Sequence, residues 1–372
     1  MEIMNNWNQF LVAQGARPVP GTGAPDSTVL ATGVLPVADF GQPLAVSQLQ
    51  EGFVAVITDQ GLIAIEGDDA ASFLHSQLTN DVDHLNQEQV RLAGYCTPKG
   101  RLLASFLMWR NATTIYLQLP RAIQPAIQKR LQMFVLRAKA KLHDATPDAS
   151  NQVVLGFGGT QAGAALSALF PALPAAPFSK VEHALGTLLR VADAFGAPRY
   201  QWLTSAATAR DAWPQLAAQL AKGGSDGWRL SEIHAGIPQI TAATQEQFVP
   251  QMVNFELLGA VNFKKGCYPG QEIVARSQYL GKLKRRTTLV SIADAAAVAG
   301  GELFAVSDPE QPCGMVVNAA PNGAGGIDAL VEMKLGAIEQ GSSEAGAVRY
   351  ASAQGAAVRF LSMPYVLDAL DL

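Results

Sequence analysis

The chain has 372 residues, of which 49% are hydrophobic and 16% charged, and its 31 acidic and 27 basic side chains give a formal net charge of −4. This length allows two or three domains with their own cores, and the apolar composition is typical of an ordered globular protein. The slightly acidic balance argues against a generally basic nucleic-acid-binding protein, although it leaves room for a local basic patch.

The cysteines and the N-terminal segment indicate a reducing compartment. Cys96, Cys267 and Cys313 are far apart and odd in number, so we expect neither a disulfide framework nor a tightly bound metal. No apolar run reaches the roughly 20 residues that cross a bilayer. The first 21 residues lack the basic start and apolar core of a signal peptide. We therefore predict a cytoplasmic protein with no membrane partner.

The first part of the chain predicts an α+β unit. Residues 54–57 and 62–65 have the pattern of a hairpin around the turn at 58–61. Asp68 or Asp69 is expected to cap a helix that runs to about Leu78. Three strands, a helix and an edge strand are then expected over residues 91–97, 101–108, 113–119, 125–135 and 138–143.

A similar order of elements returns further along. Strands and helices are expected over residues 153–157, 161–170, 188–192, 199–204 and 206–220, followed by a short helix over 228–234. Two successive units of this kind, at about 50–145 and 150–240, suggest a pseudo-duplicated body. From about Thr287, short strands alternate with turns, which favours a small β-barrel.

One stretch, Lys264–Glu272, gathers a thiol, two ammonium groups, a phenol, an amide and a carboxylate. Its two glycines and one proline favour turns, after which a helix could begin at Gln271. The thiolate is the reactive form of cysteine, and a nearby cation such as Lys265 favours it at Cys267. The alternative interpretation is a buried, inert cysteine in a glycine-rich turn, with the lysines in water.

This stretch resembles the Lys-Gly-Cys-Tyr-x-Gly-Gln-Glu signature of the YgfZ family, with Pro269 at the variable position. These are folate-binding proteins linked to iron–sulfur cluster assembly or repair, and related in fold to T-protein, the aminomethyltransferase of the glycine cleavage system. The segments at 77–82 and 99–101 are also similar to family segments. The resemblance implies a T-protein-type, ferredoxin-like α+β body over residues 1–283 in two pseudo-repeats, with a small β-barrel over 284–372.

The resemblance also implies a cleft for tetrahydrofolate or a one-carbon derivative. Cys267, activated by Lys265, is expected at the cleft or its rim, and the flat pterin is expected to stack on an aromatic ring such as Tyr268 or Tyr95. The residues expected to bind the cofactor are Asn80, Asp81, Tyr95, Lys99, Glu232, His234, Tyr268, Gln271, Glu272 and Arg276. Asn80 and Asp81 are equally suited to ending a helix in a turn.

Two departures from the resembled pattern bear on function. Relatives usually carry Ile-Glu-Ala-Gly where this chain has His234, and a neutral imidazole offers one acceptor where a carboxylate takes two N–H groups of a pterin. Pterin binding is then weaker, or Glu232 or Asp81 replaces that acid, or His234 is only a surface or capping residue. Ala104 and Ser105 stand where T-protein has its acids, and neither is a carboxylate acid or base. Classical aminomethyl transfer is therefore disfavoured, and whether the protein is an enzyme stays open.

Three functions remain at this point. The first is a folate-binding protein that supports assembly or repair of iron–sulfur enzymes, with those enzymes or assembly proteins as partners and tRNA involved indirectly. The second is a folate-dependent one-carbon or aminomethyl-type transferase that uses Cys267. The third is a tRNA-binding accessory protein that uses the basic run at 282–286, which is otherwise a solvated loop or a cationic lip for folate carboxylates.

Overall fold

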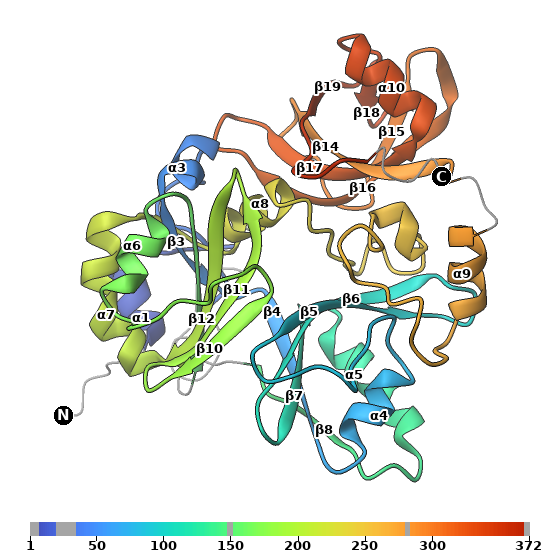
Figure 1. The fold of residues 1–372 in the computed structure, drawn as a ribbon. Coiled ribbons are helices and arrows are strands. Elements are labelled where there is room, and N and C mark those ends of the chain that lie inside the picture. Colours follow the sequence, from blue (N-terminus) through green and yellow to red (C-terminus); the bar gives the residue numbers. More distant parts are fainter. Residues whose placement is uncertain (1–6, 20–34, 147–151, 280–282, 368–372) are drawn as a thin grey trace. The chain divides into compact units, whose positions relative to one another are not determined.

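The computed structural model describes residues 7–19, 35–146, 152–279 and 283–367, which form two compact units (Figure 1). The first unit draws its described residues from 1–60, 146–235 and 320–324. The second unit draws its own from 61–145, 236–319 and 325–372. The chain therefore passes from one unit to the other several times, and neither unit is a single continuous stretch.

The first unit is built on a six-stranded sheet in the order β10-β11-β12-β9-β3-β13. Neighbouring strands are antiparallel, except that β13 runs parallel to β3. The strands are β3 (Phe53–Ile57), β9 (Gln152–Gly158), β10 (Ser179–His183), β11 (Gly186–Ala194), β12 (Ala197–Ser205) and β13 (Ala221–Gly223). A separate antiparallel pair is formed by β1 (Arg17–Pro18) and β2 (Val37–Asp39).

Helices cover both faces of this sheet. They are α1 (Trp7–Ala13), α3 (Val46–Glu51), α6 (Ala162–Ser167), α7 (Ala206–Gln219) and α8 (Ser225–His234). Residues of α1, α6 and α7 share one apolar core with Trp202 of β12. α8 packs on the opposite face of the sheet. Its Trp228 ring lies so close to Gly156 of β9 that a Cβ atom built on that glycine would be 2.3 Å from the ring. That glycine therefore makes room for the indole and brings α8 close to the strands.

The second unit contains a five-stranded sheet in the order β5-β6-β7-β4-β8. Its strands are β4 (Gln60–Glu66), β5 (Val90–Cys96), β6 (Leu102–Arg110), β7 (Thr114–Pro120) and β8 (Lys141–Asp144). The helices α4 (Ala70–His75) and α5 (Gln124–Val135) pack with this sheet in one apolar core. The strands and the helix predicted between residues 91 and 143 are confirmed, and β8 is an edge strand as expected.

The hairpin predicted over residues 54–65 is wrong, although both strands exist. β3 pairs with β9 and β13, whereas β4 pairs with β8, so the two strands belong to different sheets. The Thr58 hydroxyl accepts the Val37 N–H at 2.9 Å and lies 3.0 Å from the Ser225 hydroxyl. The connection is thus anchored within the first unit instead of closing a turn, since an apolar strand does not reveal its partner.

The helix predicted to run from Asp68 or Asp69 to Leu78 is shorter than expected. It begins after Asp69 and ends at His75. The Asp69 carboxylate accepts the backbone N–H of Lys139 at 2.7 Å and makes no capping hydrogen bond to the helix. The residues after His75 are therefore free to form the irregular segment that carries Asn80 and Asp81.

The C-terminal strands close into the predicted barrel, in the order β14-β17-β16-β15-β18-β19. They are β14 (Arg285–Ile292), β15 (Glu302–Ala305), β16 (Asp308–Pro321), β17 (Ile327–Lys334), β18 (Val348–Tyr350) and β19 (Ala356–Leu361), and α10 (Leu335–Ser343) packs beside them. The short helix η1 (Pro250–Val253) and α9 (Gln271–Tyr279) precede the barrel. The domain limits 1–283 and 284–372 stay predictions. In the described ranges, no helix is both long and apolar enough to cross a membrane.

Candidate functional site

The stretch Lys264–Glu272 forms an irregular loop that leads into α9, in the second unit. Gly270 has φ +82°, and a Cβ atom there would lie 2.4 Å from the Thr97 carbonyl oxygen and 2.7 Å from the Gly100 Cα. Gly100 itself has φ +70° and lies against Ile273. Only glycine combines these conformations with so close an approach. The two glycines therefore let the turn at 97–101 pack backbone to backbone against the start of α9.

Cys267 and Tyr268 are adjacent but differ in exposure. Cys267 is exposed, whereas Tyr268 is 6% exposed, so the alternative of a buried cysteine is wrong. Burial, reinforced by Cys96, raises the pKa of Tyr268. The Lys265 ammonium lies 4.8 Å from the centre of the Tyr268 ring, a cation–π contact. The loop thus carries an exposed thiol next to a buried aromatic ring in the sequence.

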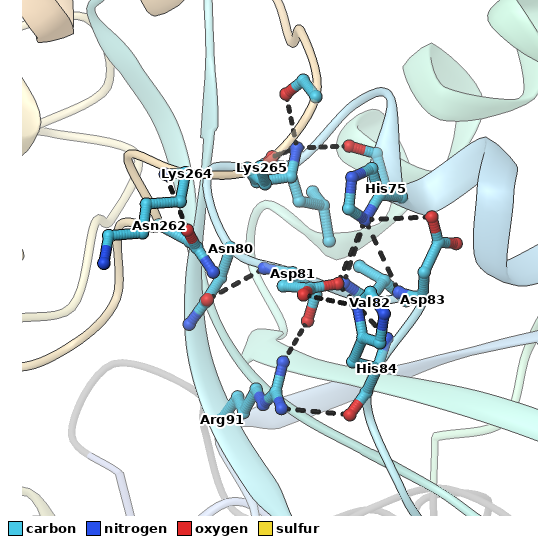
Figure 2. A network of polar contacts seen from close by, with 12 residues as sticks. His75, Asn80, Asp81, Val82, Asp83, His84, Arg91, Asn262, Lys264 and Lys265 are labelled. Carbon is cyan, nitrogen blue, oxygen red and sulfur yellow. Dashed lines mark hydrogen bonds and ion pairs between the residues drawn. The ribbon is translucent and has the colours of Figure 1, made fainter.

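Lys265 connects this loop to the end of α4 (Figure 2). Its Nζ atom donates to the backbone oxygens of His75 at 2.5 Å, Leu78 at 3.0 Å and Gly266 at 3.3 Å. Burial lowers the pKa of Lys265 to about 8, although Asp81, Asp83 and Cys267 favour the charged form. The hydrogen bonds of this ammonium thus go to backbone carbonyls, which makes Lys265 a structural clamp.

Asn80 also links two parts of the second unit. Its Nδ2 atom donates to the oxygens of Leu92 at 2.7 Å and Gly259 at 2.8 Å, and its Oδ1 atom accepts the Asp81 N–H at 2.8 Å. Because Asn80 is 5% exposed, these partners occupy most of its hydrogen-bonding capacity. The geometry supports the turn interpretation for Asn80.

Asp81 belongs to a compact ionic cluster (Figure 2). Its carboxylate lies 2.8 Å from Nδ1 of His84 and 3.2 Å from Nδ1 of His75, and Asp83 lies 3.3 Å from that same His75 atom. Burial opposes ionisation of Asp81, but hydrogen bonds from His84 and the charges of His84 and His75 outweigh it, so the pKa of Asp81 lies below its usual value. Sequence reasoning missed His75 and His84, because nothing in the local pattern shows that a helix end faces the loop after it.

Glu232 and His234 lie at the end of α8, in the first unit. Glu232 is 7% exposed, and its Oε2 atom has no hydrogen-bond partner in the described part of the chain. Burial raises the pKa of Glu232 to about 7, while the cations Arg199 and Arg229 oppose that shift. His234 packs its ring on Phe195 with the centroids 4.6 Å apart.

Arg199 is a buried cation that contacts α8. It donates to the Ser231 hydroxyl at 2.7 Å and to the Ala192 oxygen at 2.9 Å, and its guanidinium lies 4.7 Å from the Trp228 ring centre. Burial lowers its pKa to about 10. Gln201, two residues further on the same face of β12, has a buried Oε1 atom without a partner among the described residues. Among the described residues, Oε2 of Glu232 and Oε1 of Gln201 therefore accept no hydrogen bond on the α8 side of the sheet. The Trp228 indole N–H is the donor that lies toward Glu232, where it lowers the pKa of the carboxyl.

The remaining predicted residues fall in the second unit. Tyr95 is part of the apolar core, and its burial raises the pKa of its phenol. Lys99 is exposed in the turn at 97–101. On α9, Glu272 and Arg276 are exposed and Gln271 is half-buried. The acidic Glu272 stands in the first turn of that helix, where its carboxylate interacts favourably with the positive end of the helix dipole.

The basic run divides into two kinds of residue. Arg285 is paired with Glu332, and Arg286 is buried with Glu256 and donates to the Gln251 oxygen at 2.9 Å. Lys284 is exposed, while Lys282 lies outside the described residues. Two of the arginines offered to phosphate or carboxylate ligands are therefore committed to ion pairs within the second unit.

Ala104 and Ser105, which stand where T-protein has its acids, belong to β6, an internal strand of the five-stranded sheet. Ala104 is fully buried, and the buried Ser105 hydroxyl accepts the Ile240 N–H at 2.9 Å. Ser105 thus fastens the segment after α8 to β6. Among the described side chains there is no group of three or more His, Cys, Asp or Glu residues placed to hold a metal ion.

Comparison with solved structures defines the class of fold. The chain superposes on glycine cleavage system aminomethyltransferase T from Bartonella henselae with a TM-score of 0.71 over 96% of both chains, at 17% sequence identity. The fold is therefore that of the aminomethyltransferase T-proteins, a mixed α+β body followed by a closed β-barrel, which confirms the predicted fold class.

Sequence comparison gives the family within that class. No family model matches the chain. The tRNA-modifying proteins YgfZ of Escherichia fergusonii and of Escherichia coli O17:K52:H18 are each 32% identical to it over 250 residues, which are 67% of this chain and 74% of theirs. The chain belongs to the YgfZ family, as the Lys265–Glu272 signature predicts.

Proposed function

We propose that this protein binds a reduced folate, tetrahydrofolate or a one-carbon derivative, and that in this way it supports the assembly or repair of iron–sulfur enzymes, including enzymes that modify tRNA. The observation that carries the folate part is the pair of buried acceptor oxygens, Glu232 Oε2 and Gln201 Oε1, that lack donors in the described part of the chain. The relatives' name, tRNA-modifying protein, supports the link to tRNA modification.

A pterin ring fits these two oxygens chemically. Leaving a buried acceptor without a donor costs about 1–3 kcal/mol, so a ligand that supplies N–H groups gains that amount. The pyrimidinone edge of a pterin presents such N–H donors, and Glu232 would accept them in its ionised form. Glu232 thus takes the part that the missing acid at position 234 has in relatives, and a bound folate would supply a carrier for one-carbon units.

Lys99 and Arg276, two of the residues predicted to bind the cofactor, lie in the second unit. Both are exposed and make no ion pair with any described residue. Tyr268 lies in the loop that carries Cys267, and Gln271 and Glu272 lie in the first turn of α9. The contact of the Tyr268 ring with the Lys265 ammonium stabilises that loop.

Calorimetric titration with tetrahydrofolate tests the folate part. We expect micromolar binding by the wild type, at least tenfold weaker binding by Glu232→Gln, and tighter binding by His234→Glu, which restores a carboxylate. Glu302→Gln, an exposed site on the barrel, serves as the matched control. Unchanged affinity in both α8 variants would place the pterin elsewhere, and a wild type that fails to bind would remove folate from the function.

The link to iron–sulfur enzymes needs a separate measurement. In a bacterial strain that lacks its own relative of this protein, the content of thiolated tRNA nucleosides reports on iron–sulfur tRNA-thiolating enzymes. We expect the wild-type chain to restore that content and Glu232→Gln to restore less. Equal restoration by both would separate the cellular role from folate binding at Glu232.

A further inference from the structure

The helix α9 lies at the surface of the second unit (Figure 1). Of its nine residues, only Val274 is buried. Ile273 is 40% exposed and Tyr279 is 70% exposed, and Arg276 between them is exposed as well. Residues three apart lie on the same side of a helix, so these three side chains form one outward row. The row combines an aliphatic side chain, a cation and an aromatic ring.

Both ends of this row touch other segments of the second unit. At one end, a Cβ atom built on Gly100 would lie 3.0 Å from the Cβ atom of Ile273. At the other end, the rings of Phe263 and Tyr279 have their centres 5.9 Å apart. An exposed lysine directly precedes Gly100 in the sequence, and another directly follows Phe263. Together these side chains form what we call the α9 surface, which consists of Lys99, Lys264, Ile273, Arg276 and Tyr279.

The α9 surface is positively charged in a chain that is negative overall. The segments 97–101, 262–266 and 271–279 contain five cations and a single acid, Glu272, whereas the whole chain has a net charge of −4. Lys99, Lys264 and Arg276 are exposed, and none of them makes an ion pair with a described residue. These three cations are therefore available to a polyanion.

The apolar part of the surface is small and mainly aromatic. The Tyr279 ring meets Phe263 edge to face, with the planes at 69°, which restricts its orientation while most of the residue stays exposed. An exposed ring held in this way is suited to stack on an unpaired base. Protein–protein interfaces, in contrast, have a larger apolar core that is depleted of lysine. The composition of the surface therefore favours a nucleic acid over a protein partner.

We propose that the α9 surface binds a single-stranded nucleic acid, with Lys99, Lys264 and Arg276 on phosphates and the Tyr279 ring stacked on an unpaired base. Sites for single strands combine these two kinds of contact. The bases of a duplex are already stacked on each other, so the surface discriminates against double strands. Binding here requires no folate and does not involve Glu232, which belongs to the first unit.

Fluorescence anisotropy of labelled strands tests the proposal without folate. The probes are an RNA of mixed sequence with about 15 nucleotides, a DNA of the same sequence, and the RNA annealed to its complement. We expect micromolar binding of at least one single strand at about 50 mM salt, and at least fivefold weaker binding of the duplex. The RNA and DNA arms show which sugar the surface accepts. A polyglutamate peptide of the same length that binds as tightly as the strands would overturn the proposal in favour of an acidic protein partner.

A triple variant tests the phosphate contacts. Replacing Lys99, Lys264 and Arg276 by alanine should weaken binding at least tenfold and reduce the slope of log K against log salt concentration by about 2. The matched control removes three cations of the second unit that are likewise exposed and make no ion pair with a described residue, by Lys129→Ala, Arg137→Ala and Lys141→Ala. The control should stay within about twofold of wild type. Equal losses in both triple variants would show that only the net charge matters, which contradicts a defined surface.

Tyr279 tests the stacking contact separately. Tyr279→Leu keeps an apolar side chain but removes the ring, so we expect at least fivefold weaker binding of the single strand. Tyr279→Phe keeps the ring and should bind within about twofold of wild type. Because the side chain is exposed, neither change disturbs the core. Wild-type affinity in Tyr279→Leu, or a wild-type protein that binds neither RNA nor DNA single strands, would show that the proposal is wrong.

Discussion

The network around the signature loop and the network around Glu232 hold their buried charged and polar groups differently. Around the signature loop of the second unit, the Lys265 ammonium ends on three backbone carbonyls and the Asn80 amide on two. In the first unit, Arg199 finds a hydroxyl and a carbonyl, but Glu232 keeps an oxygen without a donor among the described residues. Around the signature loop, protein groups accept the hydrogen bonds of Lys265 and Asn80. Around Glu232, one carboxylate oxygen has no donor among the described residues. This difference is the reason for proposing a ligand at Glu232 and a structural role for Lys265 and Asn80.

The comparison is tested most strongly at Arg286, a buried cation of the second unit whose partner is Glu256. Arg286→Ala leaves Glu256 buried without its counter-charge, so we expect a loss of about 3–5 kcal/mol in the free energy of unfolding, measured by urea denaturation. Lys284→Ala, two residues away and exposed, is the control and should change it by less than about 0.5 kcal/mol. A loss below about 1 kcal/mol at Arg286 would show that this pair does not hold the fold.

Gly270→Ala tests whether backbone packing holds the signature loop. Its added Cβ atom would meet the Thr97 oxygen at 2.4 Å in a left-handed conformation, so we expect a loss of about 3 kcal/mol. Gly266→Ala adds a Cβ at an ordinary 3.6 Å from the His75 ring and should cost less than about 1 kcal/mol. Equal losses in the two variants, by thermal or urea unfolding, would argue against the backbone contact between residues 97–101 and α9.

Glu232→Gln tests the network around Glu232 through the pH dependence of the free energy of unfolding. The pKa of Glu232 is raised to about 7 from an ordinary 4.5, so the folded state binds more protons than the unfolded state between these values. Its contribution to stability is therefore lost as pH rises from 4.5 to 7. Relative to wild type, Glu232→Gln should gain about 2–3 kcal/mol between pH 5 and pH 8.

The matched variant for this measurement is Asp211→Asn, which changes an exposed carboxyl on α7 of the same unit. Its stability difference from wild type should stay nearly constant between pH 5 and pH 8. If Glu232→Gln behaves in the same way, the Glu232 carboxylate already has its hydrogen-bond donors in the folded protein. The contrast between the network around Glu232 and the network around the signature loop then fails.

Asn80→Ala gives the smallest of these effects. It removes the bonds of a buried side chain to the Leu92 and Gly259 oxygens and to the Asp81 N–H, so we expect a loss of about 2 kcal/mol by urea denaturation. Asn86→Ala, which removes one exposed bond to the Glu88 N–H, should cost about 0.5 kcal/mol or less. Losses of the same size would show that the Asn80 hydrogen bonds contribute no more to stability than the single exposed bond of Asn86.

Features that depend on local pattern could be predicted from the sequence. The barrel follows from short strands and turns, and the loop before α9 follows from the signature with its glycines. The hairpin at 54–65 could not be predicted correctly, because residues 54–57 of β3 and 62–65 of β4 are equally apolar and only distant strands decide their partners.

The candidate site could be predicted only in part, for a related reason. The sequence points to Cys267 and Lys265 as chemically rich neighbours, but the acceptors of the Lys265 ammonium include His75 and Leu78, far away in the chain. The contacts of His75 with Asp81 and Asp83 depend on the segment after α4 folding back toward the end of that helix. No periodicity in the sequence encodes such a return.

The order of strands in the first unit has a consequence for the growing chain. β3, a wholly buried apolar strand, leaves the ribosome well before β9 and β13, the two strands that pair with it. The strands of the five-stranded sheet all lie between residues 60 and 144, so that sheet can form while β3 still has both edges unpaired. Unpaired apolar strand edges invite aggregation. The nascent chain therefore carries an unpaired apolar strand until β9 has been synthesised.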